Sequence, residues 1–198
     1  MTVRSHHQNR STERQLSDEE VSKILAYAAK ANPEHYLIIW LMAKRGLRDG
    51  TIVSNHRNGS NLAGLQVEDL LEDRIWYDAK KGHRKYKFLP PDIVAKLRHG
   101  IGTRTQGPIF DDLAKQSSPI EAVRYFVHQY AKAVGIPDWQ YIRPHAFRHY
   151  AGYRFAEVSG FNPYAVRDFM DHSNTSIGSR YVHELPPEKQ RAIQEAMD

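Results

Sequence analysis

The run Asn32-Pro-Glu-His-Tyr-Leu-Ile-Ile-Trp-Leu-Met-Ala-Lys-Arg-Gly46 contains the longest apolar stretch of the 198-residue chain, the eight residues from Tyr36 to Ala43. Asn followed by Pro is a typical helix start, because the Asn side chain caps free backbone amides and Pro fits the first helical position. Gly after the last basic residue is a typical helix end. The run therefore predicts a buried helix from Pro33 to about Arg45. It is too short for a membrane span, which needs about 20 apolar residues.

Similar signals on both sides of this run predict a mostly helical chain. Ser17-Asp-Glu-Glu20 is a capping box, with Leu16 and Val21 placed for a hydrophobic staple, and it predicts the first helix. Ser118-Pro-Ile-Glu121 reads as a second capping box. By capping residues and apolar spacing, further helices are expected at residues 60–65, after 92, at 119–134, 145–158, 163–170 and 187–197.

Two short runs, Arg74–Ala79 and Lys85–Leu89, are strand-like and predict a hairpin. The expected fold class is therefore mainly α with a small antiparallel β-hairpin (α+β). We expect one domain over residues 16–198. Residues 1–15 lack periodicity and are expected to be a flexible arm or a remnant of cloning.

The composition excludes some classes of protein and favours a polyanionic partner. The chain has 28 Lys and Arg against 23 Asp and Glu, a net charge of +5, and no Cys, which excludes a disulfide scaffold and thiolate chemistry. The start lacks the apolar core of a signal peptide, so a cytoplasmic protein is expected. From Arg74 to Arg104 there are nine Lys or Arg and two Asp, a density expected of a surface that follows a phosphate backbone.

The densest polar sequence of the last third is Arg143-Pro-His-Ala-Phe-Arg148-His-Tyr. His145 and His149 have the helical spacing of two zinc ligands, but Ala146 stands where a zinc protease needs its Glu base. The alternative is a phosphate site, because His145 and Arg148 are three apart and project from nearly the same face of a helix. We favour the phosphate site and expect no metal.

The same residues resemble the His-x-x-Arg box of the tyrosine recombinase (phage integrase) family. The later run Met170-Asp-His172-Ser-Asn-Thr-Ser-Ile-Gly-Ser-Arg-Tyr181-Val-His resembles its Leu-Gly-His...Tyr box, with nine positions from His to Tyr. The resemblance covers nearly the whole chain and implies the family's catalytic domain. It implies His145, Arg148 and His172 as catalytic groups and Tyr181 as the nucleophile.

The remaining groups of that family can be sought earlier in the chain. Arg45-Gly-Leu-Arg48 resembles the segment with the family's first catalytic Arg, but about ten extra residues follow it, so Arg57 is the alternative to Arg48. The run Lys80-Lys81-Gly-His-Arg-Lys-Tyr-Lys87-Phe-Leu-Pro90 resembles the turn that presents a catalytic Lys, for which Lys81 fits best and Lys80 is second. The expected DNA-binding residues are Arg57, Lys80, Arg84, Lys85, Lys87 and Arg143.

The resemblance implies transesterification of double-stranded DNA through a 3′-phosphotyrosyl bond, without metal, ATP or any other cofactor. It also implies assembly into dimers or tetramers on DNA through the C-terminal tail, although the tail is equally consistent with packing on its own domain. The family's N-terminal DNA-clamp domain has no counterpart in the chain, so a truncated or compact variant is expected. Rival interpretations are a type IB topoisomerase and a catalytically silent DNA-binding protein. Arg148→Ala is expected to abolish cleavage with little loss of folding.

Overall fold

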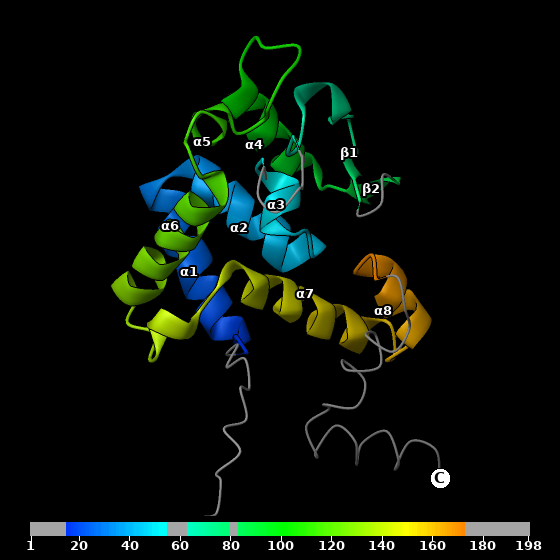
Figure 1. The fold of residues 1–198 in the computed structure, drawn as a ribbon. Coiled ribbons are helices and arrows are strands. Elements are labelled where there is room, and N and C mark those ends of the chain that lie inside the picture. Colours follow the sequence, from blue (N-terminus) through cyan, green and yellow to red (C-terminus); the bar gives the residue numbers. More distant parts are fainter. Residues whose placement is uncertain (1–14, 55–62, 80–82, 173–198) are drawn as a thin grey trace, which may run out of the picture.

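The computed structural model describes residues 15–54, 63–79 and 83–172 of the chain. Helices dominate it, and its two strands form one small antiparallel sheet (Figure 1), which confirms the predicted α+β class. In chain order the elements are α1 (Asp18–Ala31), α2 (Pro33–Arg45), α3 (Asp49–Ile52), the 3-10 turn η1 (Val67–Asp69), β1 (Arg74–Asp78), β2 (Arg84–Phe88), α4 (Pro91–Ile101), α5 (Asp111–Ala114), α6 (Pro119–Ala133), η2 (Trp139–Tyr141), α7 (Pro144–Val158) and α8 (Pro163–Phe169).

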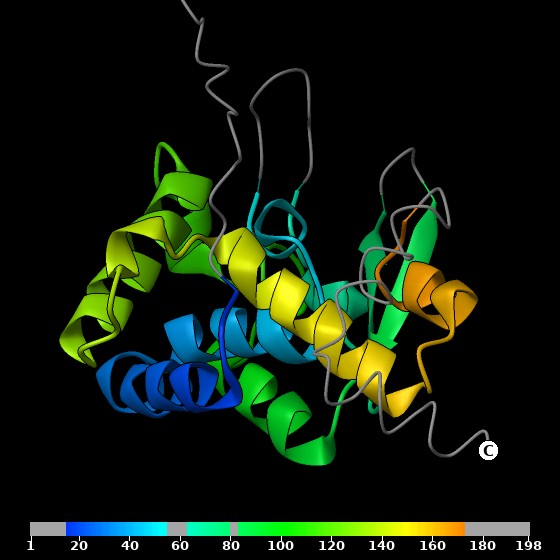
Figure 2. The same ribbon diagram turned by 90° about the horizontal axis from the view of Figure 1, so that it is seen from below.

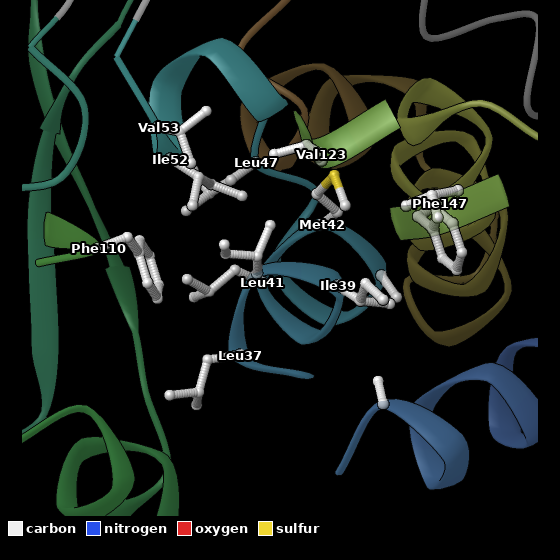
Figure 3. Close-up of a cluster of buried hydrophobic side chains, with 14 of the residues drawn as sticks. Leu37, Ile39, Leu41, Met42, Leu47, Ile52, Val53, Phe110, Val123 and Phe147 are labelled. Atoms are coloured by element: carbon white, nitrogen blue, oxygen red, sulfur yellow. The ribbon is translucent and has the colours of Figure 1, made fainter. Parts of the chain in front are cut away.

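Helix α2 is the centre of the hydrophobic core, as its apolar run predicts. Ile38, Leu41 and Met42 are fully buried, and α2 packs against α1, α4, α6 and α7. Figure 3 shows side chains of α2 between Phe110 on one side and Phe147 of α7 on the other. Burial of each large apolar side chain contributes roughly 1.5–3 kcal/mol, so this helix holds the elements around it in place.

The predicted helix ends around α2 are confirmed in detail. The Ser17 hydroxyl accepts from the amide of Glu20 at 3.2 Å, and the Glu20 carboxylate accepts from the amide of Ser17 at 3.0 Å. Asn32 caps α2, and Gly46 ends it at φ 65°. Ser118, in contrast, makes no side-chain cap to α6.

Gly46 is constrained by its backbone and by its neighbours. A Cβ there would lie 3.1 Å from the Met170 sulfur and 3.2 Å from an edge carbon of Phe169. Gly46→Ala is therefore expected to lower the free energy of unfolding by about 1–2 kcal/mol, because alanine is disfavoured at this positive φ and crowds α8. Urea unfolding measures the change. Gly100→Ala is the control, since nothing lies within 4 Å of a Cβ in that α4 position, and it should not destabilise.

The hairpin presents one face to the protein and the other outward. Its register pairs Ile75 with Lys87 and Tyr77 with Lys85. Ile75, Tyr77 and Lys87 are buried, and α8 lies beside the hairpin in both views (Figures 1 and 2). The described turn after α8, residues 170–172, therefore lies close to the inner face of the two strands.

Two expectations about local structure need correction, and two others lie outside the described residues. Residues 63–65, the described part of the helix expected at 60–65, are not helical. Gly64 is at φ 77°, and a Cβ there would lie 2.9 Å from the Ile52 carbonyl oxygen, so the chain packs closely on α3 instead. Helix α3 was not among the expected helices, because four residues are too few to show a helical period. The arm and the helix expected at 187–197 lie outside the described residues.

No helix in the described ranges is long and apolar enough to cross a membrane.

Candidate active site

Arg148 is the most deeply buried charged residue of the described chain and joins three elements. Its side chain leaves α7, and the residue is 2% exposed. One guanidinium nitrogen donates to the carbonyl of Gly46, after α2, and another to the carbonyl of Met170, after α8. A charged donor at the C-terminal carbonyls of a helix satisfies groups that the helix leaves free. Arg148 therefore ties α7 to the ends of both α2 and α8.

Arg48 and His172 lie in the same region as Arg148. Arg48 is half-buried at the N-cap of α3, two residues after Gly46. Burial, followed by the charges of Arg148, Arg48 and His149, lowers the pKa of His172 to about 4. At neutral pH, His172 is therefore uncharged and can donate one hydrogen bond while two guanidiniums supply the positive charge.

His145 and His149 lie one turn apart at the start of α7. Their rings are edge to face with centroids 4.4 Å apart, and His145 is exposed while His149 is half-buried. Among the described residues, no group of three or more His, Cys, Asp or Glu is arranged to hold a metal ion. The zinc alternative thus gains no third ligand in that part of the chain.

Asp171 forms a second polar centre between the hairpin and the turn after α8. Its Oδ2 accepts from the Tyr77 hydroxyl at 2.6 Å, and its Oδ1 lies 3.0 Å from the Lys85 ammonium nitrogen. Burial raises the pKa of Asp171, but Lys87, Tyr77 and Lys85 together outweigh burial and lower it, so the carboxyl is ionised. Burial, then the bond to Asp171, raises the pKa of Tyr77 far above its usual value.

Lys87 is not placed as a surface contact for DNA, which is the role expected from its sequence. It is 8% exposed, and its ammonium donates to the Phe169 carbonyl and lies 3.9 Å from Asp171. Burial lowers its pKa to about 8, although the Asp171 carboxylate opposes this change. Lys87 faces inward because it is paired with Ile75 on the buried side of the hairpin.

Other predicted DNA-binding residues are accessible. Arg143 is exposed at the N-cap of α7. The side chains of Arg84 and Lys85 are 55% and 42% exposed and pair with Asp69 and Asp171. Four predicted site residues lie outside the described ranges, namely Arg57, Lys80, Lys81 and Tyr181.

Sequence reasoning missed Asp171, and one signal could have identified it. Asp171 stands where the resembling box has Gly, and its φ is 52°, a left-handed conformation that Asp tolerates better than most residues. A carboxylate that replaces Gly beside a predicted catalytic His indicates a side chain with a role of its own. Nothing in the sequence pairs it with Tyr77, which is 94 residues away.

Comparisons with known proteins agree on family and fold. The model of the phage integrase family matches residues 14–188. A tyrosine recombinase of Pseudothermotoga lettingae is 30% identical over 183 residues, which are 90% of this chain and 59% of that protein's length. The chain thus spans less than two thirds of this relative.

Solved structures share the fold at low sequence identity. The XerA recombinase has a TM-score of 0.71 at 16% identity, with 93% of this chain and 65% of that chain covered. The XerH recombinase bound to a palindromic difH substrate, a post-cleavage complex, has a TM-score of 0.69 at 16% identity. The match covers 93% of this chain and 52% of that chain. The catalytic domain of bacteriophage HP1 integrase has a TM-score of 0.58 at 17% identity, and the match covers 91% of this chain and 93% of that chain. The predicted family resemblance and fold are confirmed.

Proposed function

The chain belongs to the phage integrase family, and from this premise we propose that it is a site-specific recombinase that cleaves and rejoins double-stranded DNA through a 3′-phosphotyrosyl intermediate. The observation that carries the proposal is the convergence of Arg48, Arg148 and His172, which come from three separate segments. The charges of both guanidiniums act on the uncharged imidazole of His172. Two fixed cations and one neutral hydrogen-bond donor suit the non-bridging oxygens of a phosphodiester.

In the proposed reaction, Tyr181 attacks the phosphorus and the 5′-oxygen leaves. A free phenol has a pKa of about 10, so the attack needs help with the phenolic proton. His145, exposed at the start of α7, is the proposed acceptor or positioning group. Arg48 and Arg148 stabilise the charge that grows on the non-bridging oxygens, and His172 donates a hydrogen bond to one of them.

The leaving 5′-oxygen needs a proton, and the proposed donor is the ammonium of Lys81 on the hairpin, with Lys80 as the second choice. A second strand then attacks the phosphotyrosine in reverse, so the bond energy is conserved and no nucleotide is consumed. The proposal includes no metal ion, because the guanidiniums take over the charge stabilisation that metal ions provide in other phosphoryl-transfer enzymes.

DNA contacts outside the reaction centre are proposed for the accessible basic side chains Arg143, Arg84 and Lys85, and for Arg57 and Lys80. Such contacts to phosphates give affinity that falls as salt increases. Assembly into dimers or tetramers through residues 187–198 is also part of the proposal. The XerH structure is of a recombinase bound to its DNA substrate, which supports DNA as the partner of a chain with the same fold.

Trapping the covalent intermediate tests the proposal. The chain is incubated with nicked suicide duplexes of randomised sequence in EDTA, and protein–DNA adducts are isolated under denaturing conditions and sequenced. We expect adducts at a preferred sequence with the unsubstituted chain and none with Tyr181→Phe, because phenylalanine has no nucleophilic oxygen. Adducts that survive this substitution would remove Tyr181 from its role. No adduct with the unsubstituted chain would favour a silent DNA-binding protein, and relaxation of plasmids without sequence preference would favour a topoisomerase.

A further inference from the structure

Asp171 lies in the turn that leads from α8 to His172, and its carboxylate contacts both strands of the hairpin. We propose that Asp171 is a positioning residue, whose carboxylate fixes the β1–β2 hairpin against that turn and so sets where the hairpin's ammonium groups stand relative to the scissile phosphate. This inference rests on the proposed function and adds a positioning residue to the same site.

The contacts on Asp171 come from both strands. Tyr77 of β1 donates to Oδ2 at 2.6 Å, and Lys85 of β2 lies 3.0 Å from Oδ1, at the position paired with Tyr77 in the sheet register. The Asp171 side chain is 4% exposed and Tyr77 is 3% exposed, so the bond between them is protected from water, whereas the Lys85 side chain is 42% exposed. One carboxylate therefore binds both strands at a pair of residues that face each other in the sheet.

The turn itself is held between two cations from different elements. The Phe169 carbonyl accepts from Lys87 of β2, and the next carbonyl, of Met170, accepts from Arg148 of α7. Asp171 follows directly, 3.9 Å from Lys87. The carboxylate is thus the local anion for the buried Lys87, because a buried charge is costly when no opposite charge lies near it.

The backbone transmits the position of Asp171 to His172. Asp171 is left-handed at φ 52°, and the amide of His172 donates to the Arg167 carbonyl at 3.0 Å to close the turn after α8. A rigid turn with its side chain clamped by the hairpin fixes the distance between the imidazole and the hairpin. We expect loss of the carboxylate charge to loosen the hairpin more than Arg148, whose guanidinium also donates to the Gly46 carbonyl outside this turn.

The test separates protonation of the leaving group from the rest of the reaction. In cleavage the phosphorus–O5′ bond breaks and O5′ takes a proton from a hairpin ammonium. A duplex with sulfur in place of that bridging 5′-oxygen releases a stable thiolate, which needs no proton. Two versions of a duplex recovered by adduct trapping, one with oxygen and one with sulfur, are compared with the unsubstituted chain and with Asp171→Asn, which keeps the shape and tolerates positive φ.

For Asp171→Asn we expect a loss of about 10²-fold in cleavage of the oxygen substrate, the size typical of a misplacement of about 1 Å, and a near-normal rate on the sulfur substrate. Asp168→Asn is the matched control, because Asp168 is three residues away, 68% exposed and outside this cluster. It should leave both rates unchanged. Tyr77→Phe, which removes a single bond to Asp171, should give a smaller loss with the same selectivity, and it tests the inference if Asp171→Asn does not fold.

Equal losses on the two substrates would overturn the inference, because a merely structural role affects both. Unchanged cleavage of the oxygen substrate by a folded Asp171→Asn or Tyr77→Phe would also overturn it. Failure of the unsubstituted chain to form an adduct with either duplex would contradict the proposed function instead, so the two failures are distinguishable.

Discussion

Arg148→Ala is expected to remove cleavage and to destabilise the fold, whereas the sequence alone predicted a loss of cleavage with little loss of folding. The proposed charge stabilisation accounts for a loss of about 10²–10³ in cleavage rate. The structural contribution comes from the buried guanidinium, which joins the Gly46 and Met170 carbonyls at 2% exposure. The prediction of an intact fold conflicts with this burial.

The expected cost to stability follows from what alanine would leave behind. Two buried carbonyls would lose a charged donor, at about 1–3 kcal/mol each, and the missing side chain would leave a cavity. A fall of at least about 3 kcal/mol in the free energy of unfolding is therefore expected. Since α8 and the turn to His172 depend on the Met170 bond, α8 should be the first segment to lose protection from hydrogen exchange.

Urea unfolding and adduct formation separate the two effects of Arg148. Arg154→Ala is the matched control, because Arg154 is also on α7 but is 48% exposed and pairs with Glu157. It should change the free energy of unfolding by well under 1 kcal/mol. Arg148→Lys keeps a charge without the planar fork, so it should be more stable than Arg148→Ala and still cleave slowly. An Arg148→Ala chain as stable as the Arg154→Ala chain would contradict the bridging role.

Local signals predicted the elements well, and long-range contacts explain most of what they missed. The bounds of α2 follow from Asn32, Pro33 and Gly46, because capping acts within a turn of the helix. The inward direction of Lys87 depends instead on Asp171, 84 positions later, and on the carbonyl of Phe169. A basic strand residue is normally exposed, and only a buried acceptor reverses this expectation.

The candidate site shows the same division. Resemblance to two short boxes predicts Arg148 and His172 as site residues, and in the structure the charges of Arg148 and Arg48 both act on His172. The shared surroundings of these residues, namely the Gly46 and Met170 carbonyls, are backbone groups that carry no side-chain signature. Sequence could therefore name candidate site residues, but it could not show how the backbone holds them in place.

Arg48→Ala is expected to reduce cleavage by about 10²–10³ and leave the fold nearly intact, because Arg48 is only half-buried, whereas Arg148 is 2% exposed and bonds two carbonyls. The same substitution should raise the pKa of His172 above about 4. The sign follows from charge, since the Arg48 guanidinium disfavours protonation of a neighbouring imidazole and its removal eases that protonation. An NMR titration of the histidine rings, with His172 assigned by His172→Asn, measures this pKa without any need for DNA.

Arg57→Ala is the comparison that decides between the two arginines. If Arg48 is the catalytic residue, Arg57→Ala should weaken DNA binding and reduce the slope of log affinity against log salt concentration by about 1. The rate at which bound DNA forms the adduct should stay close to normal. The opposite pattern, in which Arg57→Ala loses cleavage while Arg48→Ala changes neither cleavage nor the pKa of His172, would transfer the role to Arg57. Because burial and neighbouring charges set the pKa of His172 independently of any reaction, a raised pKa with normal cleavage would keep Arg48 beside the imidazole but exclude it from charge stabilisation at the phosphate.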